Sequence, residues 1–334
     1  MHRSRRTFLN SMATLPLATG ALLTTVRAFA ADPYPSRSIK FVVPFAAGSS
    51  TDIAARAWAE VVAAQLRPPS VIVENRAGAG GTIGATFVAR ATPDGYTLLY
   101  STATTWAVSQ FVYPDLPYKP TQDLEPIAVT TSVPVFLVVS GNSDIKDFND
   151  LAARVRANPD NYNYGTNGIG ANSHITCKLL ANRMGSPRLQ HVPFKQGSQG
   201  VMAEIMAGRL TFAVDPWSVV GGHVQSGRLR ALAVVSNARL SVAPEIPTVS
   251  ELLGQEFNTM TWSGLWGPKG VDQDIVRVLH NAIAAGYEDK QLVKQYENQG
   301  TPLMPNMTLD QVRTFMTNEV SRWEKIVQEV DVKI

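Results

Sequence analysis

The sequence changes character near its start, at Pro44-Phe45-Ala46-Ala47-Gly48-Ser49-Ser50-Thr51-Asp52. The largely apolar run Ile39 to Val43 precedes this stretch and predicts a buried β-strand. Its last four residues are all types that cap helix N-termini, so we expect a helix to begin within them. A strand, a turn of small residues and a helix start together direct free backbone N–H groups towards an anion. The stretch therefore predicts an α/β unit whose turn is suited to a carboxylate.

Short apolar runs alternate with helical patterns along most of the chain, which is typical of α/β architecture. The chain has 334 residues, enough for two domains of about 150 residues each. The β-rich stretch 127–140 is interrupted by Pro134, which cannot donate to a β-ladder, so we expect the chain to pass into a second domain there. The other expected strands are 39–43, 71–73, 96–100, 162–164, 189–192, 210–214 and 229–235.

Two helices are predicted by their side-chain patterns. The helix that begins near residue 49 places Ile53, Ala57, Trp58 and Val61 on one face. The last helix follows Thr308-x-x-Gln311, which is a capping box. Its apolar stripe predicts packing against a core and consists of Leu309, Val312, Phe315, Met316, Val320, Trp323, Val327 and Val330.

Residues 1–30 have the pattern of a signal peptide. Basic residues come first, a mildly apolar stretch follows, and Ala28-Phe29-Ala30 has the small-x-small pattern of a signal peptidase site. The run Ser4-Arg5-Arg6-Thr7-Phe8-Leu9 is similar to the twin-arginine export motif, with Asn10 where lysine is usual. An ordinary Sec signal that contains two arginines is the alternative. Either route predicts an exported chain, cleaved near Ala30.

The signal peptide carries the excess of positive charge. The whole sequence has 30 basic and 27 acidic residues, a net charge of +3. Four basic residues and no acidic ones lie in residues 1–30, which leaves 26 against 27 and a net charge of −1. A nearly neutral mature chain gives no electrostatic reason to expect nucleic acid or a membrane surface as a partner.

The sequence lacks the motifs of cofactor-binding and catalytic proteins. In the glycine-rich run 78–84, Ile83 stands where a dinucleotide fingerprint needs its last glycine, and the lysine of a phosphate-binding loop is missing. No two histidines have the spacing of a zinc helix, and no G-x-S-x-G elbow is present. Cys177 lies in an apolar helical pattern and is expected in the core. We therefore expect no metal, no cofactor and no catalytic residue, and a protein that is not an enzyme.

Five turns at strand ends are rich in Gly, Ser, Thr and Asn. In open α/β sheets, ligands bind beyond the carboxyl ends of the strands. Turns that offer hydrogen bonds without titratable side chains suit binding better than acid–base catalysis. His174 follows one of these turns and either caps it or reaches a ligand. The turns are 44–52, 78–82, 101–105, 165–170 and 215–217.

Several motifs occur in an order that resembles one family. They are Tyr34-Pro35-Ser36-Arg37, Val42-Val43-Pro44-Phe45 with Gly48, Val73-Glu74-Asn75-Arg76, Pro93-Asp94-Gly95-Tyr96, Ser173-His174, Val192-Pro193-Phe194-Lys195 and Pro247-Thr248-Val249. From about Tyr34 to the C-terminus the chain resembles the Bug family, the periplasmic substrate-binding components of tripartite tricarboxylate transporters.

The resemblance implies the fold of a type II periplasmic binding protein. Each of two α/β lobes would contain a mixed sheet flanked by helices, with the ligand cleft between the lobes. The first lobe would be discontinuous, comprising 31–132 and 254–334, with the chain returning to it near 257–266. The second lobe would comprise 133–253.

The resemblance also implies the ligand class and the site. Bug-family ligands are small carboxylates, namely di- and tricarboxylates, amino acids or aromatic acids, held by backbone N–H groups, hydroxyls and waters. The residues that match the binding turns in position are Phe45, Gly48, Ser49, Thr51, Asp52, Gly81, Thr82, Ser101, Thr102, Thr166, Asn167, His174 and Asp215.

Some of these positions have alternative roles. Asp52 would repel an anion, so we expect it to brace its turn. Asp215 either meets an ammonium or hydroxyl group of the ligand or caps the helix after Pro216. Ser49 stands where the family usually has glycine and adds a hydroxyl group to the first turn. Trp106 and Trp217 would favour an aromatic acid if they lined the cleft; core packing is the alternative.

The resemblance implies a monomeric periplasmic receptor that delivers its ligand to membrane permease subunits. A sensor that reports the same ligand to a membrane signalling kinase is one alternative. A secreted α/β hydrolase is another, although it would need a nucleophile–base pair that the sequence does not display.

Overall fold

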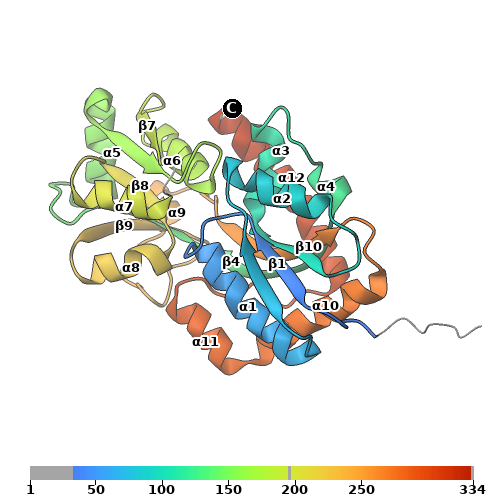
Figure 1. The fold of residues 1–334 in the computed structure, drawn as a ribbon. Coiled ribbons are helices and arrows are strands. Elements are labelled where there is room, and N and C mark those ends of the chain that lie inside the picture. Colours follow the sequence, from blue (N-terminus) through green and yellow to red (C-terminus); the bar gives the residue numbers. More distant parts are fainter. Residues whose placement is uncertain (1–32, 195–196, 332–334) are drawn as a thin grey trace, which may run out of the picture. The chain divides into compact units, whose positions relative to one another are not determined.

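The computed structural model describes residues 33–194 and 197–331, so the predicted signal peptide lies outside the described residues. Two five-stranded sheets, which we call sheet A and sheet B, organise the described chain (Figure 1). Each sheet contains both parallel and antiparallel pairs and is flanked by helices. The predicted α/β class with mixed sheets is confirmed.

Sheet A has the strand order β2-β1-β3-β10-β4. Strand β1 (Ile39–Val43) pairs in parallel with β2 (Val71–Asn75) on one side and β3 (Thr97–Thr102) on the other. Strand β10 (Thr261–Pro268) lies antiparallel between β3 and β4 (Leu124–Val133). The carboxyl ends of β1, β2 and β3 therefore meet at one edge of sheet A.

Sheet B has the order β7-β6-β8-β5-β9. Strand β6 (Asn163–Thr166) lies parallel between β7 (Gln190–Pro193) and β8 (Phe212–Asp215). Strand β5 (Val135–Ser140) pairs antiparallel with β8 and with β9 (Leu229–Val235). The carboxyl ends of β6, β7 and β8 thus form a second edge of the same kind.

Pro134 alone separates β4 of sheet A from β5 of sheet B. The long predicted β-stretch is therefore two strands in two sheets, divided at the residue that cannot donate a ladder hydrogen bond.

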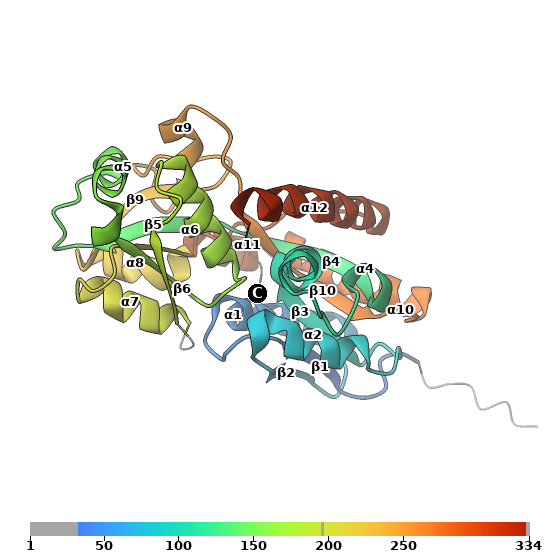
Figure 2. The ribbon, with the colours of Figure 1, turned by 90° about the horizontal axis from the view of Figure 1, so that it is seen from above.

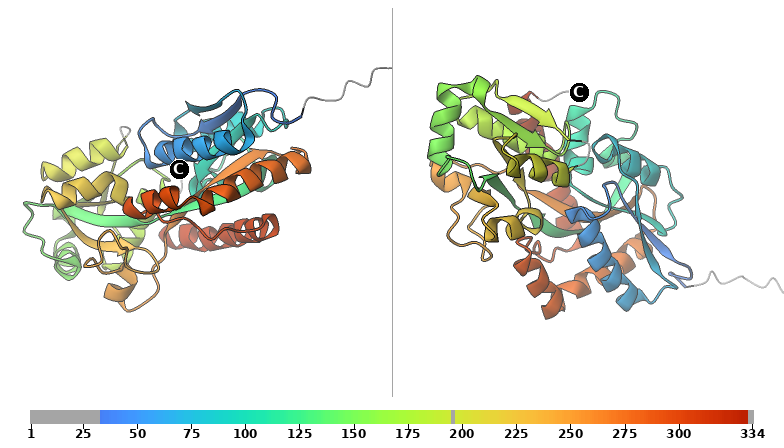
Figure 3. Two further views of the ribbon diagram at one scale, coloured as in Figure 1. Left: turned by 90° about the horizontal axis from the view of Figure 1, so that it is seen from below. Right: turned by 60° about the vertical axis from the view of Figure 1, so that its left-hand side comes forward.

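Helices cover both faces of each sheet. On sheet A, α1 and α10 pack against the face of Phe41 and Leu98, and α2 and α12 against the face of Val42 and Leu99. Helices α1 and α12 lie on opposite sides of sheet A in Figure 2, and Figure 3 agrees from below. The helices are α1 (Ser50–Leu66), α2 (Thr82–Ala89), α3 (Ser109–Val112), α4 (Pro120–Asp123), α5 (Phe148–Ala157), α6 (Asn172–Arg183), α7 (Ser198–Met206), α8 (Trp217–Gln225), α9 (Val249–Leu253), α10 (Gln273–Ala285), α11 (Lys290–Asn298) and α12 (Leu309–Val330). Across residues 33–194 and 197–331, no helix has the length and apolar character required to span a membrane.

One apolar cluster draws residues from both sheets. It contains Val42 and Leu99 of sheet A, Leu137 and Phe212 of sheet B, and the buried stripe of α12. Helix α6 contributes the fully buried Cys177 to this cluster, so its predicted place in the core is confirmed.

The predicted apolar face of α1 is partly wrong. Ile53 is 41% exposed, whereas Ala54, Ala55, Trp58 and Val62 are buried. Alanine has no side chain beyond Cβ, so an alanine-rich face lets a helix approach a sheet closely. The face of α1 that packs against sheet A is therefore not the predicted face, which carries Ile53 and Val61.

Substituting Gly264 should destabilise sheet A. A Cβ atom there would lie 2.5 Å from the carbonyl oxygen of Ala128 in β4, and β10 cannot retreat because β3 holds its other side. We expect Gly264→Ala to lower the free energy of unfolding by about 1–3 kcal/mol, measured by urea denaturation.

Gly222→Ala on α8 is the matched control, since apart from its own helix backbone and chain neighbours nothing lies within 4 Å of its Cβ position. Alanine has the higher helix propensity, so this variant should be as stable as the wild type or more stable. Equal stability of the two variants would contradict the packing of β10 described above.

Candidate functional site

The predicted site residues lie at the carboxyl ends of strands in both sheets. On sheet A they occupy the turns after β1 and β2 and the end of β3; on sheet B they follow β6, begin α6 and end β8. These are the edges at which parallel strands of α/β proteins hold ligands. The structure brings the residues together in two groups, one for each sheet.

The first group is organised by the start of α1. Ser49, the first of the four predicted cap types, is the N-cap, and its hydroxyl accepts a hydrogen bond from the backbone N–H of Asp52 at 3.2 Å. Gly48 has φ +78° and donates its N–H to Asp52 Oδ2 at 2.9 Å. The buried Thr51 lies in the first turn of the helix.

Asp52 is 3% exposed, and both of its carboxylate oxygens have donors. Asn75 Nδ2 and Arg56 Nη2 both lie 3.0 Å from Oδ1. Burial alone would raise the pKa of Asp52, but the hydrogen bonds from Arg56, the Gly48 N–H and Asn75 together hold the pKa below its usual value. Asp52 thus braces the turn and has little capacity left for a ligand.

The turn after β2 has an unusual backbone. Gly78, Ala79, Gly80 and Gly81 all have positive φ, and Ala79 is the non-glycine among them at +46°. A Cβ atom on Gly81 would lie 2.9 Å from Cγ2 of Thr105 and 3.3 Å from Cζ of Phe45. The three turns of sheet A therefore converge at Gly81, and Thr82 begins α2 beside this point.

The end of β3 contributes hydroxyl groups. Thr105 Oγ1 donates to the fully buried Ser101 at 2.9 Å, and Thr102 Oγ1 accepts from the backbone N–H of Thr104 at 3.3 Å. A five-residue π-helical turn, Thr104–Val108, follows directly, a geometry that is frequent at functional sites. Within the described residues the Thr102 hydroxyl donates no hydrogen bond, and Ser101 supports the turn by accepting from Thr105.

Two stacked histidines support the sheet B group. The rings of His174 and His191 lie 3.9 Å apart at 10°. His174 Nδ1 accepts from the N–H of Gly170 at 3.2 Å, and His191 Nε2 lies 2.6 Å from the hydroxyl of Thr166. Burial lowers the pKa of His174 to about 3 and that of His191 to about 4, and neighbouring charges add to both shifts. Both rings are therefore neutral near pH 7.

Asn167, Ser198 and Asp215 form a hydrogen-bond chain. Asn167 Nδ2 donates to Ser198 Oγ at 3.1 Å, and Ser198 Oγ donates to Asp215 Oδ1 at 2.8 Å. Burial raises the pKa of Asp215 to about 7, although the hydrogen bond from Ser198 and the nearby Asn167 amide act in the opposite direction. Pro216 is the N-cap of α8, and the start of this helix has no side-chain capping hydrogen bond. The alternative prediction that Asp215 caps the helix is therefore wrong.

The predicted binding residues did not include His191, Ser198 or Thr105, although Thr105 lies within the predicted turn 101–105. Each contacts predicted residues, but its partners lie on another strand or turn, and the sequence pattern alone gives no such pairing. Ser198 had a usable signal, because it is a serine at the start of a helix after strand β7, although Gly197 and not Ser198 is the N-cap of α7.

The two tryptophans pack in the core. Trp106 is 4% exposed, stacks on Trp266 and donates to the carbonyl of Met316. Trp217 packs against Phe136 and is nearly buried. Neither arrangement favours an aromatic ligand.

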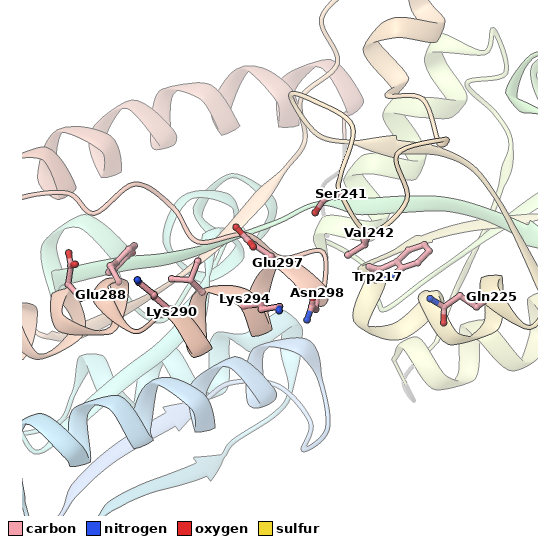
Figure 4. A pocket seen from close by; sticks show the side chains of 11 residues that line it. Trp217, Gln225, Ser241, Val242, Glu288, Lys290, Lys294, Glu297 and Asn298 are labelled. Atoms are coloured by element: carbon pink, nitrogen blue, oxygen red, sulfur yellow. The ribbon is translucent and has the colours of Figure 1, made fainter.

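A hollow of about 860 Å³ lies elsewhere, lined mainly by α11 and α8 (Figure 4). None of the residues in the predicted binding list lines it, but Trp217 does. Its charged residues are Glu288, Lys290, Lys294 and Glu297. All four are exposed, so they offer a ligand carboxylate no buried hydrogen-bond donor. We therefore place the candidate site at the strand ends. In the described part of the chain, no cluster of three His, Cys, Asp or Glu side chains could hold a metal.

Comparison with known proteins gives consistent matches. Residues 54–332 match the family model described as "Tripartite tricarboxylate transporter family receptor". Protein BugT of Bordetella pertussis is 35% identical over 306 residues, which cover 91% of this chain and 92% of BugT.

Two solved structures have the same fold over most of the chain. MatC from Rhodopseudomonas palustris with bound malate is 30% identical, with a TM-score of 0.80, and the match covers 88% of this chain and 100% of that one. An R. palustris protein with adipate is 27% identical, with a TM-score of 0.84, and the match covers 90% and 100% of the two chains.

The histidine pair predicts a pH dependence of stability. Below about pH 6.5 the unfolded chain protonates both imidazoles, whereas the folded chain does so only near pH 3–4. The free energy of unfolding should therefore fall as the pH is lowered from 7 to 5, by about 1–2 kcal/mol per histidine.

The variant His174→Asn with His191→Gln lacks these imidazoles but keeps side-chain hydrogen-bonding atoms near Gly170 and Thr166. Its free energy of unfolding, measured in urea at pH 7 and pH 5, should fall less than that of the wild type. The same fall in both proteins would mean that the histidines titrate normally.

Proposed function

The chain belongs to the tripartite tricarboxylate transporter receptor family, and on this premise we propose that it binds a small carboxylate and delivers it to the membrane permease subunits of such a transporter. Membership of a receptor family makes the chain a binding protein and not an enzyme, as the sequence predicted. The ligand class comprises di- and tricarboxylates, amino acids and aromatic acids, and the receptor acts as a monomer in the periplasm.

We propose two lobes that close on the ligand. The first comprises 31–132 and 254–334, around sheet A, and the second comprises 133–253, around sheet B. Strand bounds support this division, because sheet A takes its strands from 39–133 and 261–268 and sheet B from 135–235.

The convergence of three turns at Gly81 is the observation that carries the proposal. It brings the turns that lead into α1 and α2 together with the turn after β3, where Phe45, Gly81 and Thr105 meet. Free N–H groups at helix starts attract an anion, and Asp52 does not repel it strongly because Arg56 and Asn75 engage its carboxylate. Each charge-assisted hydrogen bond contributes about 1.5–3 kcal/mol, so three or four support a Kd near ~1 μM after the cost of ordering the ligand.

Relatives support the ligand class. The structures with malate and with adipate contain dicarboxylates, and both relatives match this chain over most of its length. A thermal-shift screen of di- and tricarboxylates, amino acids and aromatic acids tests the proposal directly. A ligand at about 100 times its Kd should add about 2.7 kcal/mol to the free energy of unfolding. The absence of stabilisation by every acid would refute the proposal.

Removing the hydroxyl of Thr82 should weaken ligand binding. Thr82 opens α2, and within the described chain its hydroxyl makes no hydrogen bond, so it is available to a carboxylate. We expect Thr82→Ala to raise Kd about tenfold, measured by isothermal titration calorimetry, with little change in the melting temperature of the empty protein.

Thr86→Ala on the same helix is the control, because the Thr86 hydroxyl already donates to the carbonyl of Thr82 at 2.7 Å. Its Kd should match that of the wild type. If Thr82→Ala also bound with wild-type affinity, the hydroxyl would have no part in the site.

We propose that residues 1–30 direct export by the twin-arginine route. The double variant Arg5→Lys with Arg6→Lys keeps the positive charge but removes the paired arginines. The double variant should accumulate in the cytoplasm uncleaved, as measured by fractionation and intact mass. Normal export of the variant would assign the signal to the Sec route.

A further inference from the structure

We propose that the hydrogen-bond chain Asn167–Ser198–Asp215 makes the sheet B end of the site select a ligand that carries a hydrogen-bond donor beside its carboxylate. The donor is a hydroxyl group, as in a hydroxy acid, or an ammonium group, as in an amino acid. This inference rests on the proposed function, since it narrows the class of carboxylate that the receptor binds.

The chain of hydrogen bonds runs along the edge of sheet B. Asn167 follows β6, Ser198 begins α7 after β7, and Asp215 ends β8, so three neighbouring strands each contribute one residue. The backbone N–H of Asn167 donates to Ser173 Oγ at 3.0 Å, which also fixes the main chain at this point. The side chain of Asn167 is exposed at the end of the chain of hydrogen bonds, whereas Asp215 is buried.

The charge of Asp215 sets the direction of both hydrogen bonds. An ionised carboxylate can only accept, so Ser198 must use its single proton on Asp215 Oδ1. Ser198 Oγ then accepts, and the group that it accepts from is the amide Nδ2 of Asn167. The amide oxygen of Asn167 is thereby turned away from Ser198. Asn167 therefore offers its amide oxygen to a ligand as an acceptor, and Ser198 takes one of its two Nδ2 protons.

Asp215 adds a second hydrogen-bond acceptor to the sheet B group. Within the described residues its buried Oδ2 atom has no hydrogen-bond donor. The contrast with Asp52 on sheet A is direct, because Gly48, Arg56 and Asn75 satisfy both oxygens of that carboxylate. A second ligand carboxylate at sheet B would meet the Asn167 amide oxygen and the like charge of Asp215. A hydroxyl or ammonium group would instead donate a hydrogen bond to these acceptors.

The test compares acids that differ only by the donor, with the full mature chain at pH 8, where the Asp215 carboxyl is ionised. Calorimetry with succinate, malate and aspartate separates the effects of a hydroxyl and of an ammonium group. Glutarate with glutamate, and phenylacetate with mandelate, extend the comparison to longer and aromatic acids. The acid with the donor should bind at least about tenfold more tightly than its partner without it.

Ser198→Ala removes the middle of the hydrogen-bond chain and lets the Asn167 amide turn either its oxygen or its nitrogen towards the ligand. The ratio of the two Kd values in each pair of acids should then fall towards one. Ser226→Ala, at the C-cap of α8, is the control, since its hydroxyl donates to the carbonyl of Gly222 in that helix, and the preference should persist. Equal binding of paired acids to the wild type, or a full preference in Ser198→Ala, would overturn the inference. Failure of every acid to bind would remove the proposed function and this inference with it.

Discussion

The pairing of β10 with both β3 and β4 is the constraint on which the rest of the structure depends. The chain leaves sheet A at Val133, builds all five strands of sheet B, and returns to sheet A only at Thr261. In this register Ser263 lies opposite Thr102 and Gly264 opposite Ser101, so the returning strand backs the end of β3 where the hydroxyl-rich turn begins. The Tyr100 hydroxyl contacts Thr130 Oγ1, which in turn donates to the carbonyl of Ser263, and this ties the three strands together.

Helix α12 secures the returning segment. Glu319 is buried in the apolar stripe of this helix and accepts from the indole N–H of Trp262 at 2.6 Å. Arg322 pairs with Glu319 and donates to the carbonyls of Asn258 and Met260. A buried carboxylate is costly unless it is paired and hydrogen-bonded, and here each of its partners belongs to α12 or to the segment that it holds. The same contacts that satisfy the charge therefore position β10.

Local signals predicted local structure well. Strand β1 has the predicted bounds, Ser49 caps α1, and Thr308 with Gln311 forms the predicted capping box. These features depend on residues within four positions of one another. The buried position of Glu319 was not predicted, because the spacing of apolar residues in α12 does not indicate which residues of β10 the helix contacts. The strand β10 itself, with Ser263 and Gly264 at its centre, has a weak β-pattern and was expected only through the family resemblance. For the site, the five turns were predicted from residue type, whereas the links through Thr105, His191 and Ser198 depend on strand order.

The apolar cluster shared by the two sheets has a consequence for folding. Val42 and Leu99 of sheet A, Leu137 and Phe212 of sheet B, and α6 and α12 all contribute to it. Opening one sheet would expose apolar surface on the other, so neither half gains from unfolding alone. The chain from Tyr34 onwards should therefore melt in a single cooperative transition, with equal calorimetric and van't Hoff enthalpies, although its strands form two separate sheets.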